Sequence, residues 1–140
     1  DVAGQMPWLT DYIAKLQAIG IKVSLFIDPE AKQIAAAVTC GADAIELHTG
    51  AYAEAGLAGN FERMNTELTR IKQAVRTAQD ANSNMLINAG HGLTRDNVYA
   101  IAQIDGIYEL NIGHALIADA VFVGLEQAVI MMKNAMHQSA

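Results

Sequence analysis

A four-residue motif, Asn-x-Gly-His, occurs twice in this chain, at 88–91 and at 111–114. Each copy follows a short, largely apolar run, at 85–87 in the first case and at 108–110 in the second. The copies are 23 positions apart, a natural length for one helix-containing crossover between parallel strands. The repeat therefore predicts two neighbouring parallel strands whose carboxyl ends carry the same chemistry.

Glycine and histidine together at strand ends suit the binding of anions and the transfer of protons. Glycine allows backbone amides to approach an anion closely, and a histidine beside it can hydrogen-bond a phosphate or carry a proton near neutral pH. For one copy alone, a turn with a surface histidine is the simpler interpretation. Its recurrence in register at two strand ends favours an active site.

The rest of the chain alternates between strand and helix patterns. Hydrophobic periodicity predicts helices at 9–19, 29–39, 61–80, 97–104 and 114–137, and strands at 22–28, 44–48, 85–88 and 109–112. Gly20 and Gly41 are expected to end the first two helices. Thr94 is expected to cap the helix at 97–104, and a break near Gly124 to divide the last helical segment into a short and a longer helix.

Four strand–helix units in succession predict an α/β fold with a parallel sheet and right-handed crossovers. Two architectures satisfy this pattern: an open doubly wound sheet, and half of an eight-stranded (β/α)8 barrel completed by sequence outside this chain. Side-chain alternation favours the barrel. Glu46 and His48 share one face of their strand, whereas Ile45 and Leu47 share the other, so two polar groups face an inner surface.

By the same alternation, Asn88 and Asn111 project from one face of the sheet. Polar residues at the inner ends of strands suit the mouth of a barrel, where the active sites of such barrels lie. A phosphate is often bound there after the last two strands, at the start of a short extra helix. Gly113 and His114 occupy that location.

Composition excludes several classes of partner. The chain has 140 residues, 52% of them hydrophobic, which is enough for one core, and a net charge of −6 without a Lys/Arg cluster, so no nucleic-acid partner is expected. Cys40 is the only cysteine, which fits a reducing cytoplasm. No apolar run reaches the roughly 18 residues that span a bilayer, so no membrane partner is expected. The start at Asp1, without methionine, suggests a fragment or a processed chain.

Four segments match a known family in order and spacing. The segments at 23–28, 45–50, 88–93 and 109–115 closely resemble pyridoxine 5'-phosphate synthase. The resemblance covers the whole chain and implies that residues 1–140 are the C-terminal half of a single (β/α)8 TIM-barrel domain. The N-terminal half of such a barrel is not in this sequence.

The resemblance also implies an activity. Members of the family join 3-amino-2-oxopropyl phosphate to 1-deoxy-D-xylulose 5-phosphate, without a cofactor, giving pyridoxine 5'-phosphate with release of inorganic phosphate and water. It further implies a homo-octamer that serves vitamin B6 biosynthesis. Because the two general bases of the family belong to the absent half, the alternative is a phosphate-binding half-barrel module or subunit without catalysis of its own.

Five residues take roles by this resemblance. His91 corresponds to the proton donor that assists a leaving oxygen, and Glu46 to the stabiliser of positive charge in the transition state. Gly92, Gly113 and His114 correspond to the binding positions for the amino-ketone phosphate. A structural histidine at 91, or a glutamate that only pairs with a neighbouring base, are the alternatives.

A metal site is a further alternative for these side chains. Imidazole and carboxylate groups bind zinc, so a site built from Glu46, His48, His91 and His114 is conceivable. Gly-His phosphate motifs explain the same residues without an ion, and we expect no metal. The family motif assigns no role to His48, which is expected behind the site or in the core.

Overall fold

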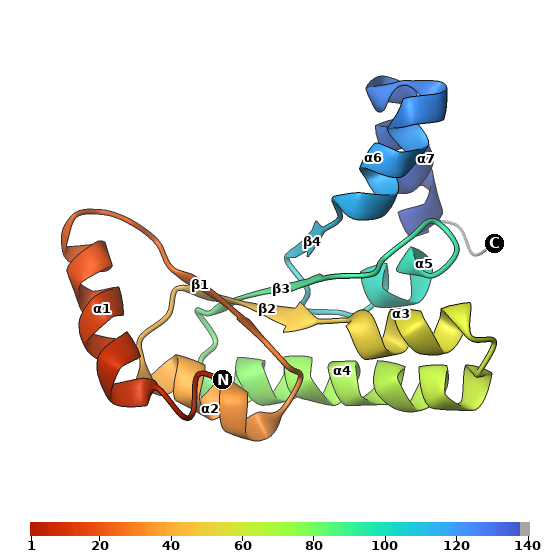
Figure 1. Cartoon of the computed structure of the whole chain (residues 1–140). Coiled ribbons are helices and arrows are strands. Elements are labelled where there is room, and N and C mark those ends of the chain that lie inside the picture. The colour runs from red at the N-terminus through yellow and green to blue at the C-terminus, as the bar shows by residue number, and fades with distance from the viewer. Residues whose placement is uncertain (138–140) are drawn as a thin grey trace.

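A computed structural model describes residues 1–137. The elements are α1 (Met6–Ala18), β1 (Ser24–Ile27), α2 (Ala31–Thr39), β2 (Ala44–His48), α3 (Gly50–Leu57), α4 (Phe61–Ala81), β3 (Leu86–Gly90), α5 (Val98–Ala102), β4 (Glu109–Asn111), α6 (His114–Val123) and α7 (Leu125–His137) (Figure 1). The strands form one parallel sheet in the order β1-β2-β3-β4. The predicted α/β fold with a parallel sheet is confirmed, and the arrangement is compatible with part of a (β/α)8 barrel.

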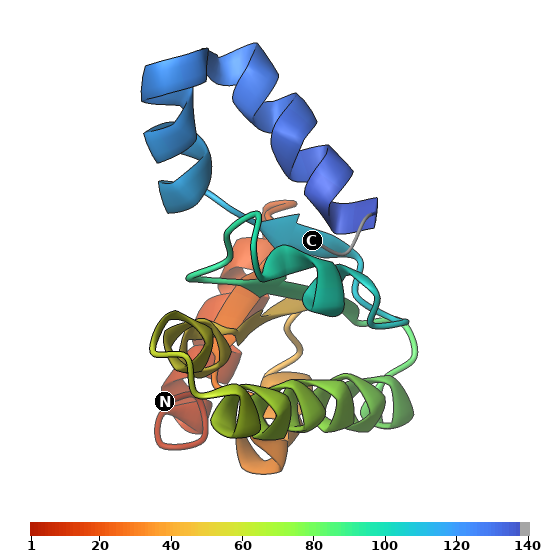
Figure 2. The same cartoon turned by 90° about the vertical axis from the view of Figure 1, so that its right-hand side faces the viewer.

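The helices that follow β1 and β2 cover one face of the sheet. Figures 1 and 2 show α2 and α4 side by side along the strands, while the α6–α7 hairpin stands away from them beyond β4. None of the helices within residues 1–137 combines the length and the apolar character needed to cross a membrane.

The hydrophobic core lies between this face and the helices. Its sheet side consists of fully buried aliphatic residues from alternate positions of the strands, and its helix side of residues from α2 and α4: Ile45, Leu47, Ile87, Ala89, Ile34, Ile71 and Val75. Burial of each large aliphatic side chain contributes roughly 1.5–3 kcal/mol to stability. The sheet register is fixed by this pattern, because a shift by one residue would turn every core side chain outward.

The opposite face of the sheet is polar and partly open. Register aligns Phe26 with Glu46, Glu46 with Asn88, and Asn88 with Glu109 across the four strands. Phe26 is 54% exposed, and Glu109 is exposed as well. The predicted alternation is confirmed, since the aliphatic residues of β2 are buried and the polar ones lie on the other face.

Element boundaries follow local signals closely where such signals exist. The strand predicted at 44–48 is β2, and Gly20, Gly41 and Gly124 all have positive φ angles at the ends of helices. At the amino end of β2, the Gln17 side chain and the Val23 amide donate hydrogen bonds to Asp43, which lower the pKa of its carboxyl group. These bonds attach the end of α1 and the loop before β1 to the start of β2.

Two local predictions were wrong. No helix is predicted at 50–57, yet α3 forms there, because Tyr52, Ala53 and Ala55 are buried and packing outweighs the two glycines of the segment. The Tyr52 hydroxyl donates to the Asn97 carbonyl at 2.8 Å, and burial raises its pKa. Asn97, not Thr94, occupies the N-cap position of α5, without a capping bond from its side chain, and the Thr94 hydroxyl accepts from the Asp96 amide within the preceding turn.

Candidate active site

The two Asn-x-Gly-His motifs meet at the carboxyl ends of β3 and β4. One cavity of about 320 Å³ is lined by both turns, including four of the five predicted site residues: His91, Gly92, Gly113 and His114. The fifth, Glu46, is connected to the same cavity through Asn111, which lines it. Residues far apart in sequence thus converge at the end of the sheet where barrel enzymes bind substrates.

Glu46 extends across β3 to reach β4. Nδ2 of Asn111 donates a hydrogen bond of 2.6 Å to Oε2 of Glu46. The carboxylate passes over Gly90, where a Cβ atom would collide with Oε1 of Glu46. The glycine therefore provides the space in which Glu46 is held, and a bond to a charged acceptor is among the stronger hydrogen bonds in proteins.

His91 has a strained backbone. Its φ of +83° is the only positive value for a residue other than glycine within residues 1–137. Left-handed conformations of such residues cost of order 1–3 kcal/mol, and they concentrate at functional sites. The side chain is exposed, and its ring lies 4.6 Å from the His48 ring and 6.3 Å from the Phe26 ring, measured between centroids.

The two glycines predicted to bind phosphate differ physically. Gly92 has a φ of +77°, and a Cβ atom there would lie 2.7 Å from Cβ of Ala53, so the fold itself requires glycine. Gly113 has a φ of −109°, and a Cβ atom would meet nothing within 4 Å. Gly113 is the residue before α6, so the amino end of that ten-residue helix opens onto the cavity.

His48 lies on the inner face beside the site. Its Nδ1 is 3.7 Å from Oδ1 of Asp28, and Phe26 packs edge-on against its ring. The conceivable zinc site does not assemble: within residues 1–137, no three His, Cys, Asp or Glu side chains are grouped as ligands of a metal ion.

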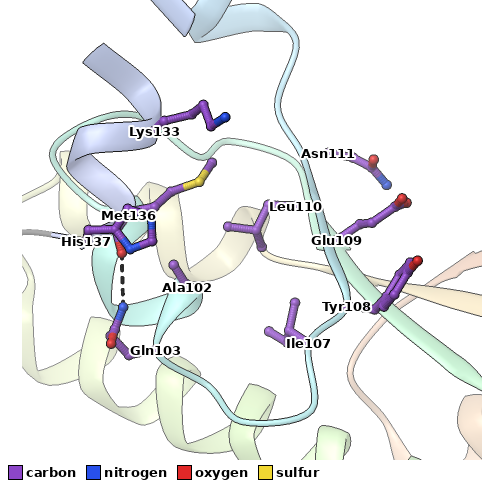
Figure 3. Close-up of a pocket in the computed structure, with 10 residues that line it drawn as sticks. All are labelled: Ala102, Gln103, Ile107, Tyr108, Glu109, Leu110, Asn111, Lys133, Met136 and His137. Carbon is purple, nitrogen blue, oxygen red and sulfur yellow. Dashed lines mark hydrogen bonds between the residues drawn. The ribbon is translucent and has the colours of Figure 1, made fainter. Parts of the chain in front are cut away.

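A larger cavity of about 610 Å³ lies elsewhere. It is bounded by α5, by α7 and by β4 with the segment before it (Figure 3). Figure 3 shows Lys133 and Met136 of α7 on one side and Tyr108 and Glu109 on the other. The smaller cavity is the better candidate site, because strand-end turns and a helix start converge on it.

Nearly the whole chain is similar to known proteins. A model of the family described as "Pyridoxal phosphate biosynthesis protein PdxJ" matches residues 1–138. The chain belongs to this family. It is 50% identical over 136 residues to the pyridoxine 5'-phosphate synthase of Synechococcus sp. (strain JA-2-3B'a(2-13)). That alignment covers 97% of the chain and 55% of the relative, so the chain spans about half the length of the curated relative it matches.

Membership in the PdxJ family confirms the resemblance inferred from the four segments. Three further residues of this PdxJ chain lie around the site: Gly90, Asn111 and Thr49. The first two belong to the repeated motif, and alternation places Asn111 on the polar face, but the sequence predicts neither the space that Gly90 leaves for Glu46 nor the hydrogen bond between Glu46 and Asn111. Thr49 gave no signal, because its importance depends on a contact with the end of a different strand.

Proposed function

We propose that this chain forms the C-terminal half of a pyridoxine 5'-phosphate synthase. The reaction joins 3-amino-2-oxopropyl phosphate to 1-deoxy-D-xylulose 5-phosphate and releases inorganic phosphate and water. The observation that carries the proposal is the convergence of two Gly-His turns and a helix start on one cavity beside the Glu46–Asn111 pair. Family membership and the name of the Synechococcus relative support it.

His91 and Glu46 supply the chemistry of this half. Ring closure requires an amine to add to a carbonyl, and the resulting intermediates must lose water and phosphate with proton transfer at each stage. His91 donates the proton that a leaving oxygen needs, and its exposed ring at the cavity is accessible to substrate. Glu46 stabilises positive charge on the substrate nitrogen through its carboxylate, which Asn111 holds in place.

The phosphate of the amino-ketone binds between the two turns. Gly92 and Gly113 leave their backbone N–H groups accessible, and the positive end of the α6 dipole attracts the anion. The imidazole of His114, the first residue of α6, adds a hydrogen-bond donor. A lysine is not required for binding of this kind, since backbone amides and the helix dipole supply the attraction.

The complete enzyme is a single (β/α)8 barrel of which residues 1–140 form the C-terminal half. β1 and β4 are the outer strands of the sheet, so each has one edge available for pairing. Exposed apolar residues also cover the α6–α7 hairpin, including Ile117, Val121, Phe122 and Leu125. The other half of the barrel supplies the closing strands and the general bases. The assembled enzyme is a cytoplasmic homo-octamer.

One observation favours a different function, that of a phosphate-binding half-barrel without catalysis. Phe26, Glu109 and Asn111 are exposed on the inner face, so this half alone leaves the reaction site open to water.

The mass of the purified polypeptide and its product distinguish the two functions. A polypeptide of about twice the 15.0 kDa of this chain that converts both substrates to pyridoxine 5'-phosphate supports the synthase. Binding of inorganic phosphate by a 15.0 kDa protein, with no product from the two substrates even when other barrel segments are added, supports the module.

A further inference from the structure

Thr49 joins the ends of β2 and β3 through its hydroxyl group. The residue is completely buried, and its Oγ1 lies 2.7 Å from the Gly90 carbonyl and 2.6 Å from the His91 carbonyl. Its backbone amide also donates to the Gly90 carbonyl at 2.8 Å. A hydroxyl has one hydrogen to donate, so the two carbonyl groups share it in a three-centre bond. The last register pair of the two strands, His48 with Gly90, directly precedes this contact.

His91 depends on such external support. Its positive φ is a conformation that persists only where the surrounding structure determines it. Within residues 1–137, no hydrogen bond from the protein holds its imidazole ring, which leaves both ring nitrogens available at the cavity. The ring is placed by the backbone turn and by its contact with the His48 ring.

Gly50 provides the space for that contact. A Cβ atom at position 50 would lie 2.5 Å from Cε1 of His48 and 3.1 Å from Cδ2 of His91. The segment from His48 to Gly50 therefore contacts His91 in two ways. The His48 ring lies against the His91 ring, and the Thr49 hydroxyl bonds to the His91 backbone carbonyl. Only the hydroxyl bonds directly to the strained residue.

We propose that Thr49 is a positioning residue for His91, rather than merely a buried polar residue of the core. The inference rests on the proposed function, in which His91 is the proton donor. Without the hydroxyl, the His91 carbonyl loses its donor, whereas the Gly90 carbonyl keeps the bond from the Thr49 amide, and the turn at His91 relaxes towards an ordinary negative φ. The imidazole ring then leaves its position at the cavity, and proton transfer slows because the donor is misplaced.

Substitutions at position 49 test this inference in the complete enzyme. Thr49→Val keeps the size but removes the hydroxyl, whereas Thr49→Ser keeps the hydroxyl. We expect Thr49→Val to lower kcat on the order of 100-fold, with a much smaller change in KM, and Thr49→Ser to retain most of the activity. Thr39→Val is the matched control, because the exposed Thr39 hydroxyl bonds only to the Ala35 carbonyl of its own helix.

A double substitution separates positioning from a general structural effect. In a His91→Asn background, Thr49→Val should cause no further loss of kcat, because both changes disable the same proton donor. An equal loss from Thr49→Val with and without His91 would overturn the proposal. If the valine variant does not fold, Thr49→Ala replaces it in each comparison.

Crystal structures of the variants give a readout that does not depend on activity. The φ angle of residue 91 should remain positive in Thr49→Ser and Thr39→Val and become negative in Thr49→Val or Thr49→Ala. An unchanged φ and ring position without the hydroxyl would refute the role of Thr49. If the wild-type enzyme forms no pyridoxine 5'-phosphate, the proposed function fails, while these structures still decide whether Thr49 holds the turn.

Discussion

The two copies of the Asn-x-Gly-His motif have the same sequence pattern but different physical surroundings. The first turn is constrained: Gly90 is buried beneath Glu46, His91 has a positive φ, and Thr49 bonds to the carbonyl groups of Gly90 and His91. The second turn is open, since Gly113 and His114 are exposed and α6 begins there. A constrained turn suits a group that must be placed accurately for chemistry, and an open helix start suits binding of an anion.

Expressing this half, with both turns, without the rest of the barrel should have the largest effect on activity. We expect residues 1–140 expressed alone to show no synthase activity and to associate or aggregate, because β1 and β4 have unpaired edges and the α6–α7 hairpin exposes apolar residues. Size-exclusion chromatography and a product assay measure this. Co-expression with an N-terminal half-barrel from the family should restore assembly and product. A monomeric, active 15.0 kDa chain would contradict the half-barrel proposal.

Replacement of the histidine in each turn tests the division of roles. His91→Asn should lower kcat on the order of 100 to 10,000-fold, the usual contribution of a positioned general acid, with little change in KM. His114→Asn should mainly raise KM for the amino-ketone phosphate. His137→Asn, on the exposed end of α7, is the matched control. Equal effects of the two main substitutions on kcat would show that the turns do not divide chemistry and binding.

Glu46 should behave like His91 rather than like His114. Glu46→Gln removes the charge but preserves the size of the side chain and its ability to accept a hydrogen bond from Asn111. We expect a loss of turnover on the order of 100- to 1,000-fold, comparable to removal of one electrostatic contact in a transition state. Thermal melting should be almost unchanged, which distinguishes loss of charge from loss of structure. Near-wild-type kcat would remove Glu46 from the mechanism.

The strands of the sheet could be predicted from the sequence more completely than the contacts of the candidate site. Alternation within 44–48 identified β2 and its polar face, because each side chain there obeys a local rule. The α3 helix and the Thr49 contact were missed, because they depend on packing and on bonds between residues about 40 positions apart. The family resemblance also assigns Gly92 and Gly113 the same role, whereas only Gly92 is restricted by its φ angle and by Ala53.

Alanine at the equivalent glycines of the two turns, Gly90 and Gly113, should lower the stability of the protein by different amounts. In Gly90→Ala the new Cβ would collide with Oε1 of Glu46 and lie 2.9 Å from the Asn111 carbonyl oxygen, so part of the backbone must shift. We expect a loss of roughly 1–3 kcal/mol, typical of overpacking, together with lower turnover. Gly113→Ala should change stability by less than about 1 kcal/mol, because the poorer helix cap and the lower entropy of the unfolded chain oppose each other. Denaturant unfolding of both variants measures the difference, and equal losses would contradict it.

Gly113→Val should have the most selective effect, on the binding of one substrate. The valine side chain has room in the protein, so it would extend into the space near the start of α6 and hinder the approach of phosphate to the backbone amides. We expect the affinity for the amino-ketone phosphate to fall by roughly tenfold, about 1.4 kcal/mol, with little change for 1-deoxy-D-xylulose 5-phosphate. Gly113→Ser, which retains a good helix cap with a smaller side chain, should fall between the wild type and valine. The KM for each substrate and calorimetric titration with inorganic phosphate measure these effects. Equal losses for both substrates would show that the open turn does not bind the amino-ketone phosphate.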